Sequence, residues 1–281
     1  MTAASTPPFT LLLPVYGRDR PDFLDRSFRS AVHEQSLRPD QVVVVKDGPL
    51  GSVLEGTVGR LVIASPVPVD VVRLPANVGL GPALQAGLAA CRHDVVARQD
   101  ADDISVPGRF ARQLPVVAAG AAVVGSGLVE FEDDESAPVG RRTPPTDPTE
   151  IVAYARLHQP FFHPTVVYRH SAIDAVGGYE DLPSLEDYWL FARMIAAGVP
   201  VANVAEPLVL YRVGAGAWGR RGGMRLLLSE VELQRRLRRC GFTSRGQMLR
   251  NLAVRGVYRL VPEDVRRRGY RRFVAGRFDR G

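Results

Sequence analysis

The sequence predicts an α/β fold in which a mixed, mainly parallel sheet is flanked by helices and followed by a helical C-terminal extension. Apolar runs without polar alternation, such as residues 9–16 and 41–45, are typical of strands that are buried on both faces. Segments of helical length separate these runs, which is the pattern of parallel strands joined by crossover helices. With 281 residues and 46% hydrophobic content, the chain can bury one large core and carry an appendage.

The elements follow from local signals. The expected strands share the buried, apolar character and cover residues 9–16, 41–45, 69–74, 94–98 and 121–131. Pro21 opens the first helix, because proline is tolerated at the first helical position. A turn at residues 46–49 closes the second strand. We expect Asn77 to cap a helix that runs to about Cys91, and another helix follows Pro107.

The chain divides into a body, residues 1–217, and an extension, residues 218–281. The body has an α/β first half, residues 1–130, and a second half, residues 131–217, which opens with a loop to Pro148 and then mixes helices with short strands. From Arg225 the pattern is helical and amphipathic, with expected breaks at Cys240-Gly241 and at Pro262.

Charge is distributed unevenly between the body and the extension. The formal net charge is +6, yet 18 arginines and five acidic residues lie between Trp218 and Gly281, so the body is net negative. Arginines alternate there with apolar residues such as Leu237 and Tyr258. This tail predicts a surface for anionic lipid or for nucleic acid, or a helix face that is simply solvated.

Targeting and redox features are weak. The two cysteines, Cys91 and Cys240, lie far apart and indicate neither a disulfide framework nor a zinc site. The first ten residues lack a signal-peptide pattern, and the longest weakly polar run, residues 114–129, is interrupted by proline and glycine. We therefore expect a cytoplasmic protein without a membrane-spanning helix.

Three carboxylates crowd together where the strand at residues 94–98 ends: Asp100, Asp102 and Asp103. Like charges at that spacing repel one another unless a cation offsets them, and carboxylate oxygens suit Mg²⁺ and Mn²⁺. The alternative is a solvated turn that caps the next helix. Position at the carboxyl end of a strand favours the ligand site, because open α/β sheets bind ligands there.

Several short motifs share an order and spacing with one known family. They are Arg98-Gln99-Asp100-Ala101-Asp102-Asp103-Ile104-Ser105, His163-Pro164-Thr165, Gly177-Gly178-Tyr179, Glu186-Asp187-Tyr188, Tyr211-Arg212 and Arg220-Arg221-Gly222-Gly223. In these motifs the chain resembles the family 2 glycosyltransferases of GT-A fold, within the subgroup of amylovoran-type and capsular-polysaccharide transferases. The resemblance begins at Leu11 and covers nearly the whole chain.

The resemblance implies an inverting, metal-dependent glycosyltransferase. It would move a sugar from a nucleotide-sugar, expected to be a UDP-sugar, to a hydroxyl of a glycan or polyprenyl-linked acceptor in cell-surface polysaccharide biosynthesis. Mn²⁺ or Mg²⁺ would act as Lewis acid on the diphosphate. Residues 1–130 would bind the donor and residues 131–217 the acceptor. The basic extension would contact an anionic membrane at its inner face, and nucleic acid is the less favoured partner.

The family's motifs assign roles to individual residues. Asp102, with Asp100, would hold the metal. The residues expected to contact the nucleotide-sugar are Pro14, Val15, Tyr16, Asp47, Asn77, Arg98, Asp100, Ala101, Arg212, Arg220 and Arg221. Plainer readings remain for some: Asp47 as an Asp-Gly turn, Arg98 as the partner of the acidic cluster, and the later arginines as surface charge.

An inverting reaction also needs a base for the acceptor hydroxyl. The family's Glu-Asp motif implies Asp187 as the base and Glu186 as an acceptor-binding or positioning group. The alternative from the residues alone is a helix cap in which Ser184 pairs with Asp187. His163 beside two phenylalanines is interpreted as a hydrogen-bonded structural residue in preference to a ligand. Some relatives in the family use a downstream histidine as a further metal ligand, but Tyr211-Arg212-Val213-Gly214 contains no histidine.

Two other functions compete with this interpretation. A nucleotidyltransferase uses the same metal and phosphate chemistry as a glycosyltransferase. Its basic, glycine-rich signature is matched only weakly by Gly17-Arg18-Asp19-Arg20. A non-catalytic nucleic-acid-binding module would use the arginine tail. The sequence contains neither a Gly-x-Gly-x-x-Gly motif nor a Walker lysine, which argues against dinucleotide and P-loop enzymes.

Overall fold

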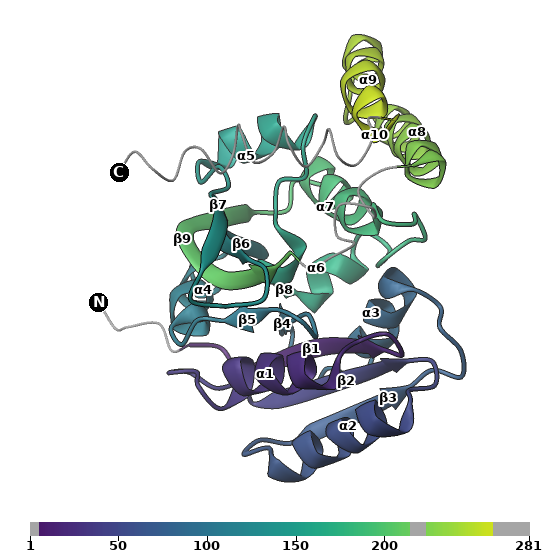
Figure 1. Cartoon of the computed structure of the whole chain (residues 1–281). Helices are drawn as coiled ribbons and strands as arrows, with labels where there is room; N and C mark the ends of the chain where they lie inside the picture. The colour runs from purple at the N-terminus through teal and green to yellow at the C-terminus, as the bar shows by residue number, and fades with distance from the viewer. Residues whose placement is uncertain (1–5, 214–222, 261–281) are drawn as a thin grey trace.

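One nine-stranded sheet organises the molecule (Figure 1). A computed structural model of the chain describes residues 6–213 and 223–260; Arg220, Arg221 and Pro262 lie outside these residues. The strand order is β3-β2-β1-β4-β8-β6-β9-β5, with β7 paired to β6. Ladders β1–β2, β1–β4, β2–β3 and β6–β9 are parallel and hold most of the paired residues, whereas the ladders of β5, β7 and β8 are antiparallel.

The first half alternates strands with helices, as the apolar runs predict. Its elements are β1 (Phe9–Tyr16), α1 (Pro21–Val32), β2 (Gln41–Asp47), α2 (Ser52–Ala64), β3 (Val69–Arg73), α3 (Leu80–Leu88) and β4 (Val95–Arg98). All four strands are parallel, so their carboxyl ends meet at one edge of the sheet. The loops that follow Tyr16, Asp47 and Arg98 therefore lie together, which is where an open α/β sheet binds ligands.

The second half continues the same sheet. Its elements are β5 (Ile104–Ser105), α4 (Arg109–Ala118), β6 (Val123–Phe131), β7 (Pro138–Arg142), α5 (Pro148–Ala155), the 3₁₀ turn η1 (His163–Thr165), β8 (Val167–Arg169), α6 (His170–Asp174), α7 (Glu186–Ala196) and β9 (Val201–Arg212). Antiparallel β8 joins the two halves, because it pairs with β4 on one side and with β6 on the other. The motifs after β4 and at the start of α7 thus belong to one domain core.

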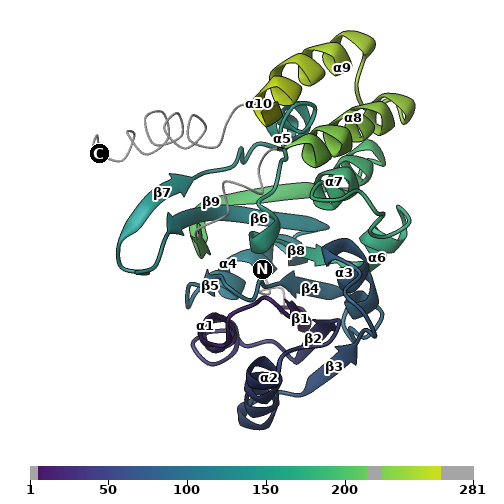
Figure 2. The same ribbon diagram turned by 45° about the vertical axis from the view of Figure 1, so that its right-hand side comes forward.

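Helices cover both faces of the sheet (Figures 1 and 2). Alternate side chains of one strand enter different cores: Leu11 and Leu13 pack with α1, α2 and α4, whereas Leu12 packs with α3 and α7. This is why the buried strands lack polar alternation. Gly87 of α3 allows a close approach, since a Cβ there would lie 2.4 Å from Leu12.

The C-terminal helices pack against the body on α7. They are α8 (Met224–Arg239), α9 (Arg245–Asn251), the π-helical turn η3 (Leu252–Gly256) and α10 (Val257–Leu260). Leu233 and Leu237 of α8 are fully buried in the same core as Tyr188 and Phe191 of α7. Glu230, also fully buried, forms ion pairs with Arg255 at 2.7 Å and Arg259 at 3.1 Å. The break predicted at Cys240-Gly241 is confirmed, because α8 ends at Arg239.

Several local expectations were wrong. Asn77 does not cap α3, which begins at Leu80 after Gly79 and ends at Leu88 rather than near Cys91. The loop expected before Pro148 contains strand β7, which forms an antiparallel ladder with β6. Among the described helices, none is both long and apolar enough to cross a bilayer.

Candidate active site

Buried polar side chains anchor the acidic turn, Asp100–Asp103, which follows β4. Gln99 is fully buried, and its amide donates to the carbonyl of Asp103 at 2.8 Å and to the hydroxyl of Ser27 at 2.9 Å. Arg109, also fully buried, donates to the Gln99 side-chain oxygen at 3.0 Å and to the Arg98 carbonyl at 2.7 Å. Two of these bonds end on the backbone carbonyls of Asp103 and Arg98, at either end of the turn, and the other two join side chains to one another, so the backbone that carries the carboxylates is anchored by the protein itself.

Arg98 supplies a positive charge next to the turn. Its guanidinium is 2% exposed and forms an ion pair with Asp100 at 2.5 Å. Burial is the largest single influence and tends to lower the pKa of Arg98, but the charges of Asp100, Tyr179, Tyr168 and Asp187 together outweigh it and raise that pKa. The Nε and Nη1 atoms of Arg98 have no hydrogen-bond partner in the described protein. The pairing of Arg98 with the acidic cluster is therefore present in the structure, and the two unpartnered nitrogens are enclosed in the protein.

Asp103 and Arg212 tie the acidic turn to the end of β9. The backbone N–H of Arg212 donates to Asp103 Oδ1 at 2.9 Å, and its side-chain Nε donates to the Asp102 carbonyl at 3.1 Å. The Arg212 guanidinium lies 3.8 Å from the ring centre of Phe23 and 4.4 Å from that of Phe131. Arg212 Nη1 also donates to the Glu132 carbonyl at 3.1 Å. Three hydrogen bonds and two aromatic rings therefore fix the position of Arg212. Arg212 thus positions the turn that carries Asp102.

Asp19 joins the acidic group, and the sequence reasoning missed it as a site residue. Its carboxylate accepts the N–H of Tyr16 at 2.9 Å, directly after β1. Burial, together with the charges of Asp102 and Asp100, raises the pKa of Asp19 to about 7 against the lowering effect of that hydrogen bond. Its place after the first parallel strand was the available signal, because that strand ends at the same edge as β4.

Asp47 organises the loop between β3 and α3. Its carboxylate accepts N–H bonds from Val78 at 2.7 Å and Gly79 at 3.1 Å, and a bond from the Asn77 amide at 2.9 Å. A glycine is required at position 48, where φ is +85° and a Cβ would lie 2.5 Å from the Asn77 nitrogen. Asp47 and Asn77 therefore lie together, and their contacts shape the wall of the site.

The remaining donor-side candidates lie around the same edge. Val15 and Ala101 are buried in the core, Pro14 is half-buried, and Tyr16 is 41% exposed. Tyr16 therefore lies partly outside the core at the end of β1, while Val15 and Ala101 pack inside it and support the backbone.

Glu186 and Asp187 form the first turn of α7. The helix cap expected from Ser184 is absent: Leu185 precedes the helix, no side chain caps it, and Ser184 has a φ of +65°. Asp187 Oδ1 accepts the Tyr188 N–H at 2.7 Å, whereas Oδ2 contacts His163 Nδ1 at 3.2 Å and accepts a bond from the Gln159 amide. A carboxylate has about four acceptor positions, so one remains.

The two neighbouring carboxylates of α7 have opposite pKa shifts. Burial, reinforced by the charge of Asp187, raises the pKa of Glu186 to about 7. Burial also acts to raise the pKa of Asp187, but His163 and the hydrogen bonds from Gln159 and Tyr188 outweigh it and lower that pKa. Glu186 lies against Gly81 of α3, where a Cβ would be 3.3 Å from the Glu186 Cγ. The second half of the body thus closes on the first at this point.

The carboxylate and imidazole groups near the acidic turn decide whether a divalent cation fits there. No group of three or more His, Cys, Asp or Glu side chains in residues 6–213 and 223–260 is arranged to hold a metal ion by itself. The two ring nitrogens of His163 are directed at Asp187 and Tyr179 rather than at the acidic turn. One or two carboxylates, however, are the usual protein share of a Mg²⁺ site that is completed by substrate phosphates. Asp102 and Asp100 fit such a shared site.

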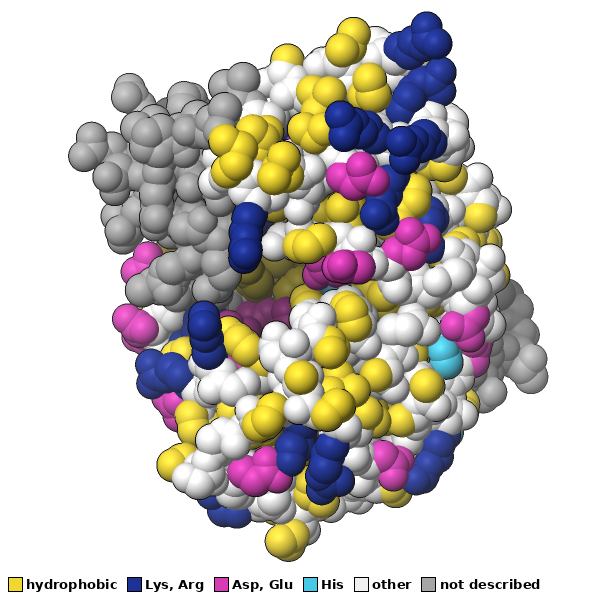
Figure 3. Space-filling model, turned by 90° about the vertical axis from the view of Figure 1, so that its right-hand side faces the viewer, with side chains coloured by type: hydrophobic (Ala, Val, Ile, Leu, Met, Phe, Trp, Pro, Cys, Tyr) yellow, Lys and Arg dark blue, Asp and Glu magenta, His cyan; other side chains and the backbone are white. Residues whose placement is uncertain are grey.

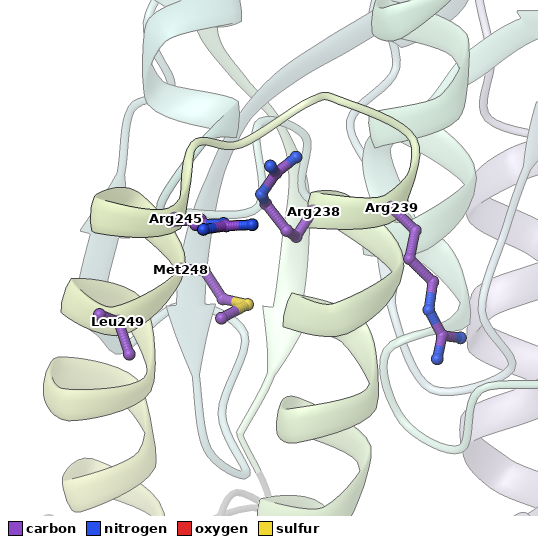
Figure 4. A pocket seen from close by; sticks show the side chains of 5 residues that line it. All are labelled: Arg238, Arg239, Arg245, Met248 and Leu249. Atoms are coloured by element: carbon purple, nitrogen blue, oxygen red, sulfur yellow. The ribbon is translucent and has the colours of Figure 1, made fainter.

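A basic and apolar surface lies on the C-terminal helices. Arg238, Arg239 and Arg245 line an open depression of about 410 Å³ with Met248 and Leu249. In Figure 4, Arg238, Arg245 and Met248 extend into the space between α8 and α9, whereas Arg239 extends away from it. Figure 3 shows Lys and Arg side chains gathered in the upper part of a face whose middle is hollowed, with acidic side chains within the hollow.

Comparison with known proteins identifies close similarities over nearly the whole chain. The family model described as Glycosyl transferase family 2 matches residues 10–177. The chain is 36% identical over 260 residues to the amylovoran biosynthesis glycosyltransferase AmsE of Erwinia amylovora, covering 92% of this chain and 96% of that protein. It is 30% identical over 272 residues to an Escherichia coli UDP-Gal:alpha-D-GlcNAc-diphosphoundecaprenol beta-1,3-galactosyltransferase, with 96% and 97% covered.

Solved structures share the fold. S. aureus TarS, residues 1–349, aligns with a TM-score of 0.63 at 14% identity, covering 88% of this chain and 71% of that one. A mannosyltransferase of Pyrobaculum calidifontis in complex with GDP-Man and Mn²⁺ aligns with a TM-score of 0.62 at 15% identity, covering 93% and 72%. At this level of identity the likeness concerns the fold alone, and it confirms the predicted GT-A architecture.

Proposed function

This chain belongs to glycosyl transferase family 2 and is a glycosyltransferase, and we propose that it transfers a sugar from a UDP-sugar to a lipid-linked glycan acceptor with inversion at C1. The single observation that carries the proposal is the meeting of the acidic turn, Asp100–Asp103, with Glu186 and Asp187 of α7 across Arg98. The charge of Asp187 contributes to the raised pKa of Arg98, as does that of Asp100, so both groups lie within electrostatic reach of the guanidinium. A nucleotidyltransferase or a nucleic-acid module is less well supported than this family.

Residues 1–130 supply the donor side in this proposal. Tyr16 and Asp47 end neighbouring parallel strands, and the base and ribose would bind between the loops that follow them. Asn77 and Arg98 would complete the wall. The Arg98 guanidinium is buried, so its positive charge, and not a hydrogen bond from its enclosed Nε and Nη1 atoms, would act on the diphosphate. Arg220 and Arg221 are proposed as further phosphate contacts, although both lie outside the described residues.

Asp102, with Asp100, would hold Mn²⁺ or Mg²⁺ together with the donor phosphates. When bound, the ion would offset the charge that grows on the departing nucleoside diphosphate. The protein's own contribution is the fixed turn: Gln99, Arg109 and Arg212 hold the backbone of the carboxylates through buried hydrogen bonds. The P. calidifontis mannosyltransferase, which shares the fold, forms a complex with its nucleotide-sugar and Mn²⁺, and this supports the proposal.

Asp187 is proposed as the general base. Its remaining acceptor position takes the proton of the acceptor hydroxyl while the hydroxyl oxygen forms a bond to C1 of the sugar. The bond from C1 to the diphosphate oxygen breaks, and its electron pair leaves with the nucleoside diphosphate. Attack opposite to the leaving group inverts the configuration at C1. Glu186, whose pKa of about 7 lets it carry a proton near neutrality, would position the acceptor.

The acceptor is proposed to be presented at an anionic membrane surface on its cytoplasmic side. The relative from E. coli carries a diphosphoundecaprenol acceptor in its name. In residues 223–260, Arg238, Arg239 and Arg245 are outside the ion pairs that bind other arginines to Glu230 and Glu232. Leu249 beside them is 63% exposed. Exposed apolar groups flanked by arginine match the interfacial region of an anionic bilayer.

A ligand panel tests the proposal directly. Nucleotide-sugars with different bases and sugars would be screened for thermal stabilisation with and without Mn²⁺, since a ligand that binds only the folded state raises its melting temperature. Stabilised donors would then be assayed for transfer to a sugar-diphosphate polyprenol. We expect a UDP-sugar to stabilise and to be consumed. Absence of stabilisation by every nucleotide-sugar, together with RNA binding through the C-terminal helices, would instead establish the nucleic-acid module.

A further inference from the structure

Two buried side chains, His163 and Tyr179, form a hydrogen-bonded chain that ends on Asp187. The Tyr179 hydroxyl lies 2.9 Å from His163 Nε2, and His163 Nδ1 lies 3.2 Å from Asp187 Oδ2. His163 belongs to η1, Tyr179 to the loop after α6, and Asp187 to the first turn of α7. His163 is 6% exposed and Tyr179 is 8% exposed, so the chain is shielded from solvent.

The protonation pattern of this chain follows from its ends. Burial, assisted by the charge of Arg98, lowers the pKa of His163 despite the opposing effect of Asp187, so the imidazole is neutral and carries one N–H. A carboxylate only accepts, so that hydrogen is on Nδ1 and is donated to Asp187. Nε2 then accepts the O–H of Tyr179, which burial keeps protonated by raising the Tyr179 pKa. The carboxylate partner thus assigns the tautomer of His163, and the Tyr179 hydroxyl also interacts with that of Tyr168.

Aromatic packing also holds the imidazole ring of His163 in place. The ring of Phe191 meets it edge-on with centres 5.7 Å apart, and the Tyr179 ring lies 5.8 Å away. Tyr179 is itself anchored through its backbone N–H, which donates to the Gln85 side chain at 2.8 Å. With the ring held by these contacts, the hydrogen bond from Nδ1 orients the Asp187 carboxylate together with the bonds from Gln159 and Tyr188.

We infer that His163, oriented by Tyr179, is a positioning residue that aims the Asp187 carboxylate at the acceptor hydroxyl during sugar transfer. The inference rests on the proposed function, in which Asp187 is the base. His163 itself neither touches substrate nor exchanges a proton, since its Nδ1–H stays on the ring and its Nε2 is occupied by Tyr179. It acts on the reaction only through the direction and ionisation of Asp187.

The charged groups that face this pair come from three elements. Glu186 precedes Asp187 on α7, Arg98 approaches from β4, and Asp100 acts on His163 from the acidic turn. Glu186 and Asp100 carry the same sign as Asp187, whereas Arg98 opposes them. Removing the His163 hydrogen bond therefore leaves Asp187 with less stabilisation of its charge, and the acidic limb of the kcat profile is expected to move to higher pH.

Two matched variants separate the donor function of His163 from its bulk. In His163→Asn the side-chain amide occupies roughly the place of Nδ1 and retains a donor for Asp187. In His163→Gln the amide reaches the place of Nε2 instead. We expect His163→Gln to lower kcat by about 10²-fold, the usual effect of a misplaced catalytic group, with the donor KM unchanged and the acidic limb shifted upward. His163→Asn is expected to recover most of kcat and the original limb.

The outcomes are distinguishable from failure of the proposed function. Wild-type kcat and pH profile in His163→Gln would overturn the inference, and so would equal losses in both variants with an unmoved limb, which indicate a purely structural residue. Near-normal transfer by Asp187→Asn would instead reject Asp187 as the base. If His163→Gln does not fold, Tyr179→Phe decides: a several-fold loss of kcat with a shifted limb supports the inference, and unchanged kinetics overturn it.

Discussion

The guanidinium of Arg98 is buried and forms an ion pair with Asp100, whose side chain retains 21% of its exposure, at 2.5 Å. The two partners are thus unequal, because water reaches the carboxylate but not the cation. Removing one partner of a buried pair leaves the other charge uncompensated, at a cost of about 3–5 kcal/mol. The solvent contact of Asp100 makes the loss of Arg98 the milder change.

We therefore expect Asp100→Asn to lower the free energy of unfolding more than Arg98→Met does, with losses near the upper and lower ends of that range. Denaturant unfolding at neutral pH measures both, and Arg29→Met, at an exposed arginine of α1, serves as control. Equal and small losses would mean that the pair contributes little to stability and that Arg98 is held for a ligand instead.

The metal prediction concerns Asp102. UDP should bind more tightly with Mn²⁺ or Mg²⁺ than with chelator, because the ion would bridge the carboxylates and the diphosphate. Asp102→Ala should remove most of that enhancement and leave the metal-free affinity almost unchanged. Titration calorimetry gives both values, and Asp174→Ala, an exposed aspartate on α6, is the matched control. Equal UDP affinity of the wild-type protein with and without metal would contradict a metal site at Asp102.

A second site prediction separates binding from chemistry at Asp187. Asp187→Asn keeps the shape of the side chain but replaces one accepting oxygen by a donating NH2 and removes the base, and donor affinity should persist because Asp187 lies on the acceptor side. Transfer should fall by about 10²–10⁴-fold, the usual contribution of a general base. Glu186→Gln should mainly raise the acceptor KM. If Glu186→Gln instead abolishes transfer while Asp187→Asn does not, the roles of the two carboxylates are reversed.

The raised pKa of Glu186 predicts how stability depends on pH. The folded-state pKa of about 7 exceeds the ordinary value of 4.5, so this group's stabilising contribution is fully present below about pH 4.5. It is lost as pH rises through about 7, where the buried side chain ionises. Glu186→Gln cannot ionise. Its melting temperature relative to wild type should therefore be higher at pH 8 than at pH 5.

Thermal unfolding across that range checks the sign. Glu150→Gln, at an exposed position in the first turn of α5, should show no such trend. A wild-type and a Glu186→Gln curve that run parallel from pH 5 to pH 8 would mean that Glu186 titrates as an ordinary exposed carboxyl.

Strand positions could be read from the sequence because buried parallel strands are apolar on both faces, as at Val42 to Val45. The acidic turn was equally readable, since its position after β4 depends only on chain order. The contacts between Asp47 and Asn77 could not be predicted from the sequence. Both residues are typical of turns and caps, and only the tertiary approach of the loop before α3 decides that they bind each other.

The pairing of His163 with Asp187 was also beyond local reasoning. The two residues are far apart in sequence, and η1 and α7 are brought together by the packing of Phe161 and Phe191, whose ring centres lie 5.0 Å apart. The position of Arg212 between Phe23 and Phe131 has the same origin. The sequence alone suggested a phosphate contact for Arg212, because a guanidinium group is suited both to phosphate oxygens and to aromatic rings.

The last prediction concerns the C-terminal helices. One stripe of α8 is buried on the body, while Met224 and Leu228 are each 63% exposed, as is Leu249 of α9. Arg238, Arg239 and Arg245 line one depression with Leu249, so exposed apolar and cationic side chains lie side by side there. Each arginine near an anionic surface contributes about 1 kcal/mol. Changing these three to serine should lower partitioning onto phosphatidylglycerol vesicles by about 10²-fold at low salt.

Vesicle sedimentation separates this from a solvated arginine face. The full-length protein should sediment with phosphatidylglycerol vesicles but not with phosphatidylcholine vesicles, and added salt should release it because exposed charges are screened. A triple change at Arg29, Arg38 and Arg73, exposed arginines of the first half, removes the same charge and should leave binding nearly intact. Equal losses in the two triple variants would reduce the effect to net charge. Absence of binding to either vesicle at low salt would show that the arginines of α8 and α9 simply face water.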